Sequence, residues 1–166
     1  MAVRQVLRYP HATLKAPARP VVDVGDASRR LAEDLVDSMR AGPATVGLAA
    51  PQIGVPLRAF VIDVSSHPKA VSSHGLVVLF DPEVLGSAGG EVAREGCLSV
   101  PDLTADVRRA SRMAVRGMDE HGTERTFDFA GFEARAAAHE LDHLDGILIL
   151  DRVDAASSLF PRRVYR

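Results

Sequence analysis

The chain has 166 residues, of which 46% are hydrophobic and 25% charged, so we expect one globular domain over residues 1–166 with a single core. Its formal net charge of −2 gives no reason to expect a nucleic-acid site, and no apolar stretch approaches the roughly 20 residues of a membrane span. One cysteine, Cys97, excludes an intramolecular disulfide framework and fits a reducing compartment, so the expected location is the cytoplasm.

A helix is predicted in the first quarter of the chain. Asp26 or Ser28 has a side chain that can cap its first turn, and apolar residues recur after them at helical spacing. The pair Gly42-Pro43 then ends the helix, because proline cannot continue it. We expect the apolar stripe of this helix to face the core.

Strands dominate the middle of the chain. Residues 57–64 and 76–80 are rich in β-forming side chains, and the second run is expected to end before Pro82. A polar loop connects the two runs. Residues 112–118 and 125–129 alternate apolar and polar side chains around a short polar turn, which is typical of a hairpin.

The motif His139-Glu140-x-x-His143 lies on a second predicted helix. Four alanines precede it and favour helix, and a glycine follows it, so the helix is expected over residues 131–145. Residues 147–150 then form a short strand or a buried extension. Because strands surround one dominant helix, the sequence predicts an α+β fold.

This motif is typical of a metal site. The two histidines are four residues apart, so on a helix both imidazoles face one side and can bind the same ion. Glu140 would lie beside them as the proton acceptor for an attacking water. A solvated helix face that carries His and Glu by chance is the alternative interpretation.

A catalytic site of this kind normally has three protein ligands, and the motif supplies two. Downstream, Ile149 stands where a metzincin would have histidine, and no glutamate follows Glu140, which disfavours an ordinary metallopeptidase. Asp151 and Asp154 remain as weak candidates. Upstream, Cys97 would complete a set of one thiolate and two imidazoles, although a lone cysteine is often only a small buried side chain.

Three blocks of sequence occur in the order found in one enzyme family. They read GLAAPQ at residues 47–52, EGCLS at residues 95–99 and HELDHLDG at residues 139–146. With them the chain resembles peptide deformylase over about residues 3–153. Members of this family remove the formyl group from the N-terminal methionine of new bacterial and organellar polypeptides. The resemblance implies antiparallel or mixed β-sheets wrapped around a central metal-binding helix.

The resemblance also implies the roles of the central residues. Cys97, His139 and His143 would bind one divalent metal ion per chain. The family generally uses Fe(II), and Zn, Ni or Co can occupy the same site, whereas ligand softness alone would suggest Zn. Glu140 would accept the proton of the attacking water and later deliver it to the departing amine.

Substrate contacts are implied in the same way. The side-chain amide of Gln52 and the backbone N–H of Leu98 would donate to the oxyanion that forms during hydrolysis. The peptide is expected to bind as an extended strand along Thr45, Val46 and Gly47. The expected partners are N-formyl-methionyl nascent peptides, the expected state is a monomer, and docking on the ribosome is left open.

Supporting groups are expected around these residues. Glu95 and Asp142 would accept hydrogen bonds that orient the metal ligands, and Arg109 or Arg108 would pair with Glu95. Solvated surface charges are the alternative for all four. The apolar pocket for the methionine side chain is expected to be lined by Leu98, Phe132 and Ala136.

The chain departs from the family pattern at three positions. Thr45 stands where the first block usually begins with glycine, which puts a close backbone approach there in doubt. Ala138 replaces the glutamine that usually precedes the third block, so a supporting hydrogen bond is lost. Thr104 stands near where many relatives carry a basic residue, so contacts to the peptide backbone are expected to be weaker.

Three other functions remain as alternatives. The first is a specialised or resistant deformylase that acts on another N-formyl substrate, suggested by Thr45 and Ala138. The second is a metallopeptidase, which the missing downstream ligand disfavours. The third is a non-catalytic binding module, which the intact Cys97, Glu140 and Gln52 disfavour.

Overall fold

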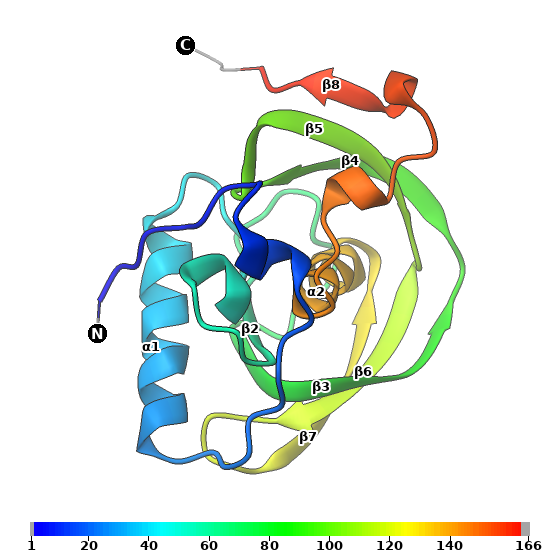
Figure 1. The fold of residues 1–166 in the computed structure, drawn as a ribbon. Helices are drawn as coiled ribbons and strands as arrows, with labels where there is room; N and C mark the ends of the chain where they lie inside the picture. The colour runs from blue at the N-terminus through cyan, green and yellow to red at the C-terminus, as the bar shows by residue number, and fades with distance from the viewer. Residues whose placement is uncertain (1, 164–166) are drawn as a thin grey trace.

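The computed structural model describes residues 2–163, and one helix enclosed by β-strands forms its centre (Figure 1). Helix α2 (Gly131–Leu144) runs through the middle of the molecule, and helix α1 (Asp26–Ala41) packs on the outside. All strand pairs within the two described sheets are antiparallel. The predicted α+β fold is therefore confirmed. No helix within residues 2–163 is long and apolar enough to cross a membrane.

The larger sheet has five strands in the order β1-β2-β3-β6-β7. Its strands are β1 (Gly47–Ala49), β2 (Ala59–Ile62), β3 (Val77–Ala88), β6 (Arg112–Met118) and β7 (Glu124–Ala130). Phe60 and Leu79 from its central strands are fully buried in the core that also holds α2. Strand β1 has a single neighbour in this sheet, so its other edge can pair with an added strand.

The smaller sheet has the order β4-β5-β8. Its strands are β4 (Glu91–Cys97), β5 (Val100–Arg109) and β8 (Leu159–Pro161). The pairing of β4 with β5 shifts register between Gly96 and Cys97, just before the turn that joins the strands. This irregular end of the hairpin brings the thiol of Cys97 into the interior beside α2.

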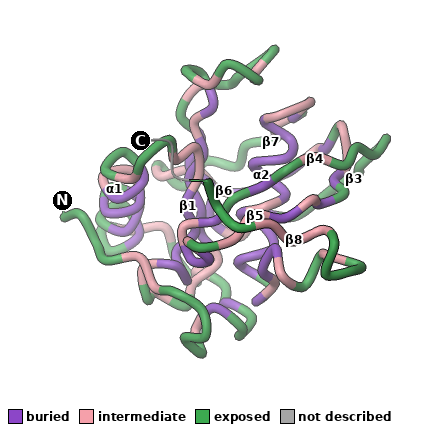
Figure 2. The backbone as a smooth tube through the Cα atoms, turned by 90° about the horizontal axis from the view of Figure 1, so that it is seen from above, coloured by how far each residue is buried: buried purple, intermediate pink, exposed green. Residues whose placement is uncertain are grey.

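Helix α2 is buried on nearly every face, as Figure 2 shows by its colour. Its alanines favour helix and are small enough to let strands approach closely. The chain enters the helix through Gly131 at φ 57° and leaves it through Gly146 at φ 72°, both in the left-handed region that favours glycine. The helix expected over residues 131–145 is confirmed to within one residue.

The predicted helix before Gly42-Pro43 is confirmed as α1, but the prediction of its cap is wrong. The N-cap is Gly25, which has no side-chain cap bond, and Asp26 already lies in the first turn. There its carboxylate faces the positive end of the helix dipole. The hydroxyl of Ser28 instead donates to the carbonyl of Asp23 at 2.9 Å.

Two strand boundaries differ from the prediction. The run expected to end before Pro82 continues as β3 to Ala88, because a register shift between Phe80 and Glu83 accommodates the proline. Asp81 lies at φ 48° in this irregularity, which a local sequence pattern does not reveal. Conversely, the strand predicted over residues 57–64 is the shorter β2.

The two remaining predictions for this part of the fold hold. Strands β6 and β7 form the expected hairpin, and Gly122 donates its backbone N–H to Asp119 across the turn. Residues 147–150 form the buried extension rather than a strand. Leu148 and Ile149 are almost fully buried there, and Ile149–Asp151 form a 3-10 helix.

Candidate metal centre

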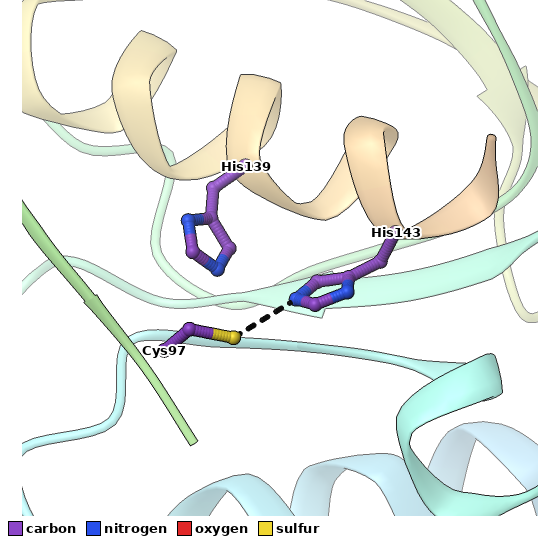
Figure 3. Close-up of side chains that lie close together, drawn as sticks. All are labelled: Cys97, His139 and His143. Atoms are coloured by element: carbon purple, nitrogen blue, oxygen red, sulfur yellow. Dashed lines mark hydrogen bonds between the residues drawn. The ribbon is translucent and has the colours of Figure 1, made fainter. Parts of the chain in front are cut away.

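Three potential metal ligands converge in the interior (Figure 3). Cys97 is the last residue of β4, and His139 and His143 lie one turn apart on α2. One ligand atom from each side chain lies within 4.8 Å of the others, and Cys97 Sγ is 3.3 Å from Nε2 of His143. The structure therefore brings together the three residues that the sequence singled out.

The chemistry of this donor set fits a divalent metal ion. Burial alone raises the pKa of the Cys97 thiol, but the charge of His143 and hydrogen bonds from both imidazoles hold that pKa well below its usual range. The thiolate is the form that binds metal. One thiolate and two imidazoles suit zinc or iron and leave a coordination position for water or substrate.

Glu140 lies beside the two histidines in a water-poor environment. Its side chain is nearly fully buried, and its Oε2 has no hydrogen-bond partner among residues 2–163. Burial raises the pKa of Glu140 to about 7 against the opposing charges of His139 and His143. Gly47 makes this position possible, because a Cβ there would come within 2.5 Å of Glu140 Oε1.

Glu95 holds the ring of His139 and is itself held by two arginines. Its Oε2 lies 3.0 Å from Nδ1 of His139, while Arg109 and Arg135 donate to its two oxygens at 2.8–3.0 Å. Burial raises the pKa of Glu95, but the hydrogen bonds and charges of His139 and Arg109 lower it to about 2. Glu95 is therefore a fixed carboxylate that points Nε2 of His139 toward the thiol.

The expectations for the other supporting groups are partly wrong. Asp142 contacts no imidazole; it pairs with Arg109 and Arg152, both at 2.5 Å, and so supports Glu95 through Arg109. Its carboxylate meets the guanidinium groups of Arg109 in β5 and of Arg152 after α2 instead. Arg109 is the partner of Glu95, and Arg108 forms no ion pair within the described residues. His143 Nδ1 is buried with no hydrogen-bond partner in that part of the chain.

Gln52 is held with its amide group facing the thiol. Its Oε1 accepts the backbone N–H of Ala49 at 2.9 Å, so its NH₂ group points the other way. That group lies 3.2 Å from Ser99 Oγ and 3.8 Å from Cys97 Sγ. Gln52 is 2% exposed, which excludes a role as a surface loop residue.

A pocket of about 230 Å³ opens beside Cys97, His139 and Glu140. Its lining contains the residues expected at the substrate site, which are Thr45, Val46, Gly47, Leu98, Phe132 and Ala136. Thr45 has an ordinary backbone conformation, and the left-handed φ of 52° falls on Ala44 instead. The expected loss of a close backbone approach at Thr45 stays a prediction.

The family model for polypeptide deformylase matches residues 3–158. The chain belongs to the polypeptide deformylase family. A peptide deformylase of Desulforudis audaxviator is 42% identical over 165 residues, covering 98% of this chain and 99% of the relative. Another, of Thermodesulfovibrio yellowstonii, is 37% identical over 153 residues, covering 92% and 90% of the two chains.

Solved deformylase structures share the fold. Peptide deformylase from Thermotoga maritima has a TM-score of 0.84 at 32% identity, covering 93% of this chain and 100% of that one. The complex of Ehrlichia chaffeensis peptide deformylase with actinonin has a TM-score of 0.88 at 28% identity, covering 95% and 92%. The resemblance found in the sequence is thereby confirmed.

Sequence reasoning missed several residues of this deformylase site. Arg135, which lines the pocket and pairs with Glu95, lies four residues before His139, so helical spacing alone could have found it. Lys69 and Arg162 also line the pocket, and only the fold brings them there, from a loop and from the C-terminal tail.

Proposed function

We propose that this member of the deformylase family hydrolyses the N-formyl group of methionine at the start of new polypeptides and releases formate. The observation that carries the proposal is the placement of Glu140 and Gln52 beside the three metal-ligand candidates in one pocket. Family membership supports the same activity. The reaction adds water to the formyl carbon, breaks its C–N bond and leaves a free α-amine.

Cys97, His139 and His143 would hold the metal, which we propose to be one Fe(II) per chain, with Zn, Ni or Co able to replace it. When bound, the metal polarises the formyl carbonyl as a Lewis acid and makes water a better nucleophile at neutral pH. Glu95 keeps the His139 ring oriented toward it, because its carboxylate is bonded to Nδ1. Burial protects the thiolate from solvent.

Glu140 carries the proton. A carboxylate whose pKa burial raises to about 7 can accept a proton from the attacking water and return it to the amine as the C–N bond breaks. Its second oxygen has no partner among the described residues and is free for this task.

Gln52 and Leu98 would stabilise the charge on the formyl oxygen. The NH₂ group of Gln52 is fixed by the bond from Ala49 to its carbonyl oxygen, so it is ready to donate without reorganisation. The backbone N–H of Leu98, one residue after Cys97, is the second proposed donor. A donor that is oriented before the reaction contributes more than one that must reorient.

The peptide would add a strand to the open edge of β1, along Thr45, Val46 and Gly47. Its methionine side chain would enter the apolar part of the pocket between Phe132 and Ala136. Phe132 is backed by the ring of His67, stacked at 4.1 Å, so this wall of the pocket is stiff.

A formate-release assay tests the proposal against its alternatives. We expect turnover of formyl-Met-Ala-Ser by the Fe(II)-loaded protein, and loss of turnover in Cys97→Ala. Faster turnover of other formylated amines would instead indicate a specialised deformylase. Casein cleavage that survives Cys97→Ala would indicate a metallopeptidase, and binding of formyl peptides without turnover would indicate a binding module.

A further inference from the structure

The C-terminal tail places a guanidinium group at the mouth of the pocket. Strand β8 pairs with β5, and just after it the backbone N–H of Arg162 donates to the carbonyl of Asp102 at 2.9 Å. The Arg162 side chain then turns back onto the backbone of Gly96, where a Cβ would collide with its Nη2. Because Gly96 precedes Cys97, the cation lies close to the metal-ligand candidates.

The charge of Arg162 has no partner of opposite charge in the described part of the chain. Within residues 2–163 it makes no ion pair, although its side chain contacts the pocket lining. Of the two carboxylates that line the same pocket, Glu95 is already bonded to Arg109 and Arg135. Glu140 lies deeper, beside the histidines. A positive charge therefore remains at the mouth of a pocket in a protein whose net charge is −2.

Two further basic side chains line the same pocket, and we call Lys69, Arg94 and Arg162 together the cationic rim. All three line the pocket, and Arg94 also lines two neighbouring hollows, one shared with Arg162 and one with Lys69. Arg94 pairs with Asp106 and stacks on Phe160 of β8 with its guanidinium 3.4 Å from the ring centroid. Lys69 forms no ion pair with any described residue.

We propose that Arg162 binds a carboxylate of the peptide in the residues that follow the formyl-methionine, so that the enzyme favours acidic sequences there. This inference rests on the proposed function, since it requires the formyl group to sit at Cys97. An extended peptide advances about 3.3 Å per residue, so the second and third residues reach the mouth when the first fills the pocket. The planar guanidinium of arginine can make two parallel hydrogen bonds to a carboxylate, and the backbone of Arg162 is already held by its bond to Asp102.

Two sources supply such a carboxylate: an Asp or Glu side chain, or the terminal carboxylate of a short peptide. Formyl-Met-Ala-Glu-amide compared with formyl-Met-Ala-Gln-amide tests the side chain, and formyl-Met-Glu-Ala-amide compared with its Gln counterpart tests the second position. Formyl-Met-Ala-Ser compared with its amide tests the terminal group. We expect kcat/KM to be about 2- to 5-fold higher for at least one acidic member of these pairs, the size of a partly exposed ion pair.

The preference should appear as a lower KM for the acidic peptide, because its ion pair with Arg162 is the same in the ground state and the transition state. Screening by 0.5 M NaCl should reduce the preference. In Arg162→Gln the ratio should fall to about 1, and in Arg162→Glu it should invert. Arg163→Gln is the matched control, since it removes the same charge one residue further along at a side chain that lines the adjoining hollow but not the pocket beside Cys97. The preference should persist in that variant.

The possible outcomes separate the role of Arg162 from the proposed deformylase function. Equal kcat/KM for the acidic and neutral members of both side-chain pairs would overturn the preference for acidic sequences. Equal kcat/KM in the terminal pair as well would overturn the role of Arg162, and either result would leave the deformylase function standing. A preference that survives Arg162→Gln, or that Arg163→Gln removes as effectively, would overturn the assignment to Arg162. Failure to release formate from any of the peptides would overturn the proposed function together with the inference.

Discussion

Two buried glutamates at the candidate metal centre lie in opposite environments, which gives them different tasks. Glu95 is surrounded by donors from His139, Arg109 and Arg135, so it stays ionised and cannot act as a proton carrier. Glu140 has a buried oxygen without a partner in the described part of the chain, so its proton affinity rises. Carboxylates whose environments separate their pKa values in this way divide into a structural group and a proton-transfer group.

Replacing Glu140 by glutamine should abolish proton transfer and leave the ligands in place. The amide has nearly the same shape but cannot accept the proton, so formate release should fall by about 10²- to 10⁴-fold. Metal content, measured by elemental analysis of the same sample, should be unchanged. Turnover close to that of the parent protein in Glu140→Gln would refute the assignment of the proton carrier.

Replacing Glu95 by alanine should weaken both metal binding and stability. Arg135 would lose its ion-pair partner in the buried site and Arg109 would keep only Asp142, so the free energy of unfolding should fall by about 3–5 kcal/mol. Loss of the acceptor for His139 should weaken metal binding about 10- to 100-fold. Denaturant unfolding and a metal titration measure the two effects.

An exposed ion pair provides the control for Glu95. In Glu83→Ala the lost partner is Arg116, and both side chains are largely solvent-exposed, so unfolding should change by less than about 1 kcal/mol. If Glu95→Ala lowered the free energy of unfolding no more than Glu83→Ala does, Glu95 would not be the residue that holds the His139 ring.

At the scale of elements, the sequence predicted those helices and strands that are determined by residues close together in the chain. Both helices and the β6–β7 hairpin follow from apolar spacing and turn residues, and their bounds agree closely with the structure. The continuation of β3 past Pro82 depends on a bulge against β6, and β4, β5 and β8 are held by pairing between distant residues. Such pairing leaves little trace in a short window of sequence, so these elements were missed.

The exit from α2 depends on Gly146. A Cβ there would lie 2.8 Å from the backbone of Lys15, and the residue also has a left-handed φ. Gly146→Ala should therefore lower the free energy of unfolding by about 1–2 kcal/mol for the backbone conformation and about 1–3 kcal/mol more for the crowding.

Gly75→Ala separates these two contributions. Gly75 has the same φ of 72° but nothing within 4 Å of its would-be Cβ, so alanine there should show the conformational cost alone. Chemical denaturation of both variants measures the difference. If both variants lost the same free energy of unfolding, the close approach of Gly146 to Lys15 would add nothing to the cost of the substitution.

Helix α1 fixes the N-terminal segment through Asp34, which accepts hydrogen bonds from the backbone of Ala2 and the side chain of Arg4. Burial raises the pKa of Asp34, but these bonds and the charge of Arg4 outweigh it and lower the pKa below its usual 3.8. The bonds therefore stabilise the fold above pH 3.8, and this contribution is lost as the pH falls through the lowered pKa.

The difference in unfolding free energy between the parent protein and Asp34→Asn should accordingly shrink on acidification from about pH 6 to about pH 3. Asp37→Asn on the same helix is the control, because Asp37 has no ion pair among the described residues. A constant difference across this range would contradict the role of the Asp34 carboxylate.

At the scale of the whole molecule, the fold assembles the site from segments that lie far apart in the sequence. The sequence singled out the three metal-ligand candidates, Glu140 and Gln52, because short motifs carry them. It did not separate the orienting role of Glu95 from the indirect role of Asp142, since that depends on which face of α2 meets β5. Nor did it place Arg162 at the pocket, which requires the tail to pair with β5. Residues brought together only by tertiary packing are the ones that local patterns miss.

The central claim is that formate release depends on one metal ion held by Cys97, His139 and His143. Anaerobically purified protein, stripped by a chelator and reloaded with graded Fe(II), tests it most directly when formate release from formyl-Met-Ala-Ser is measured at each loading. We predict activity that rises in proportion to bound metal and saturates at about one ion per chain. Formate release at full rate from the stripped protein would contradict the account.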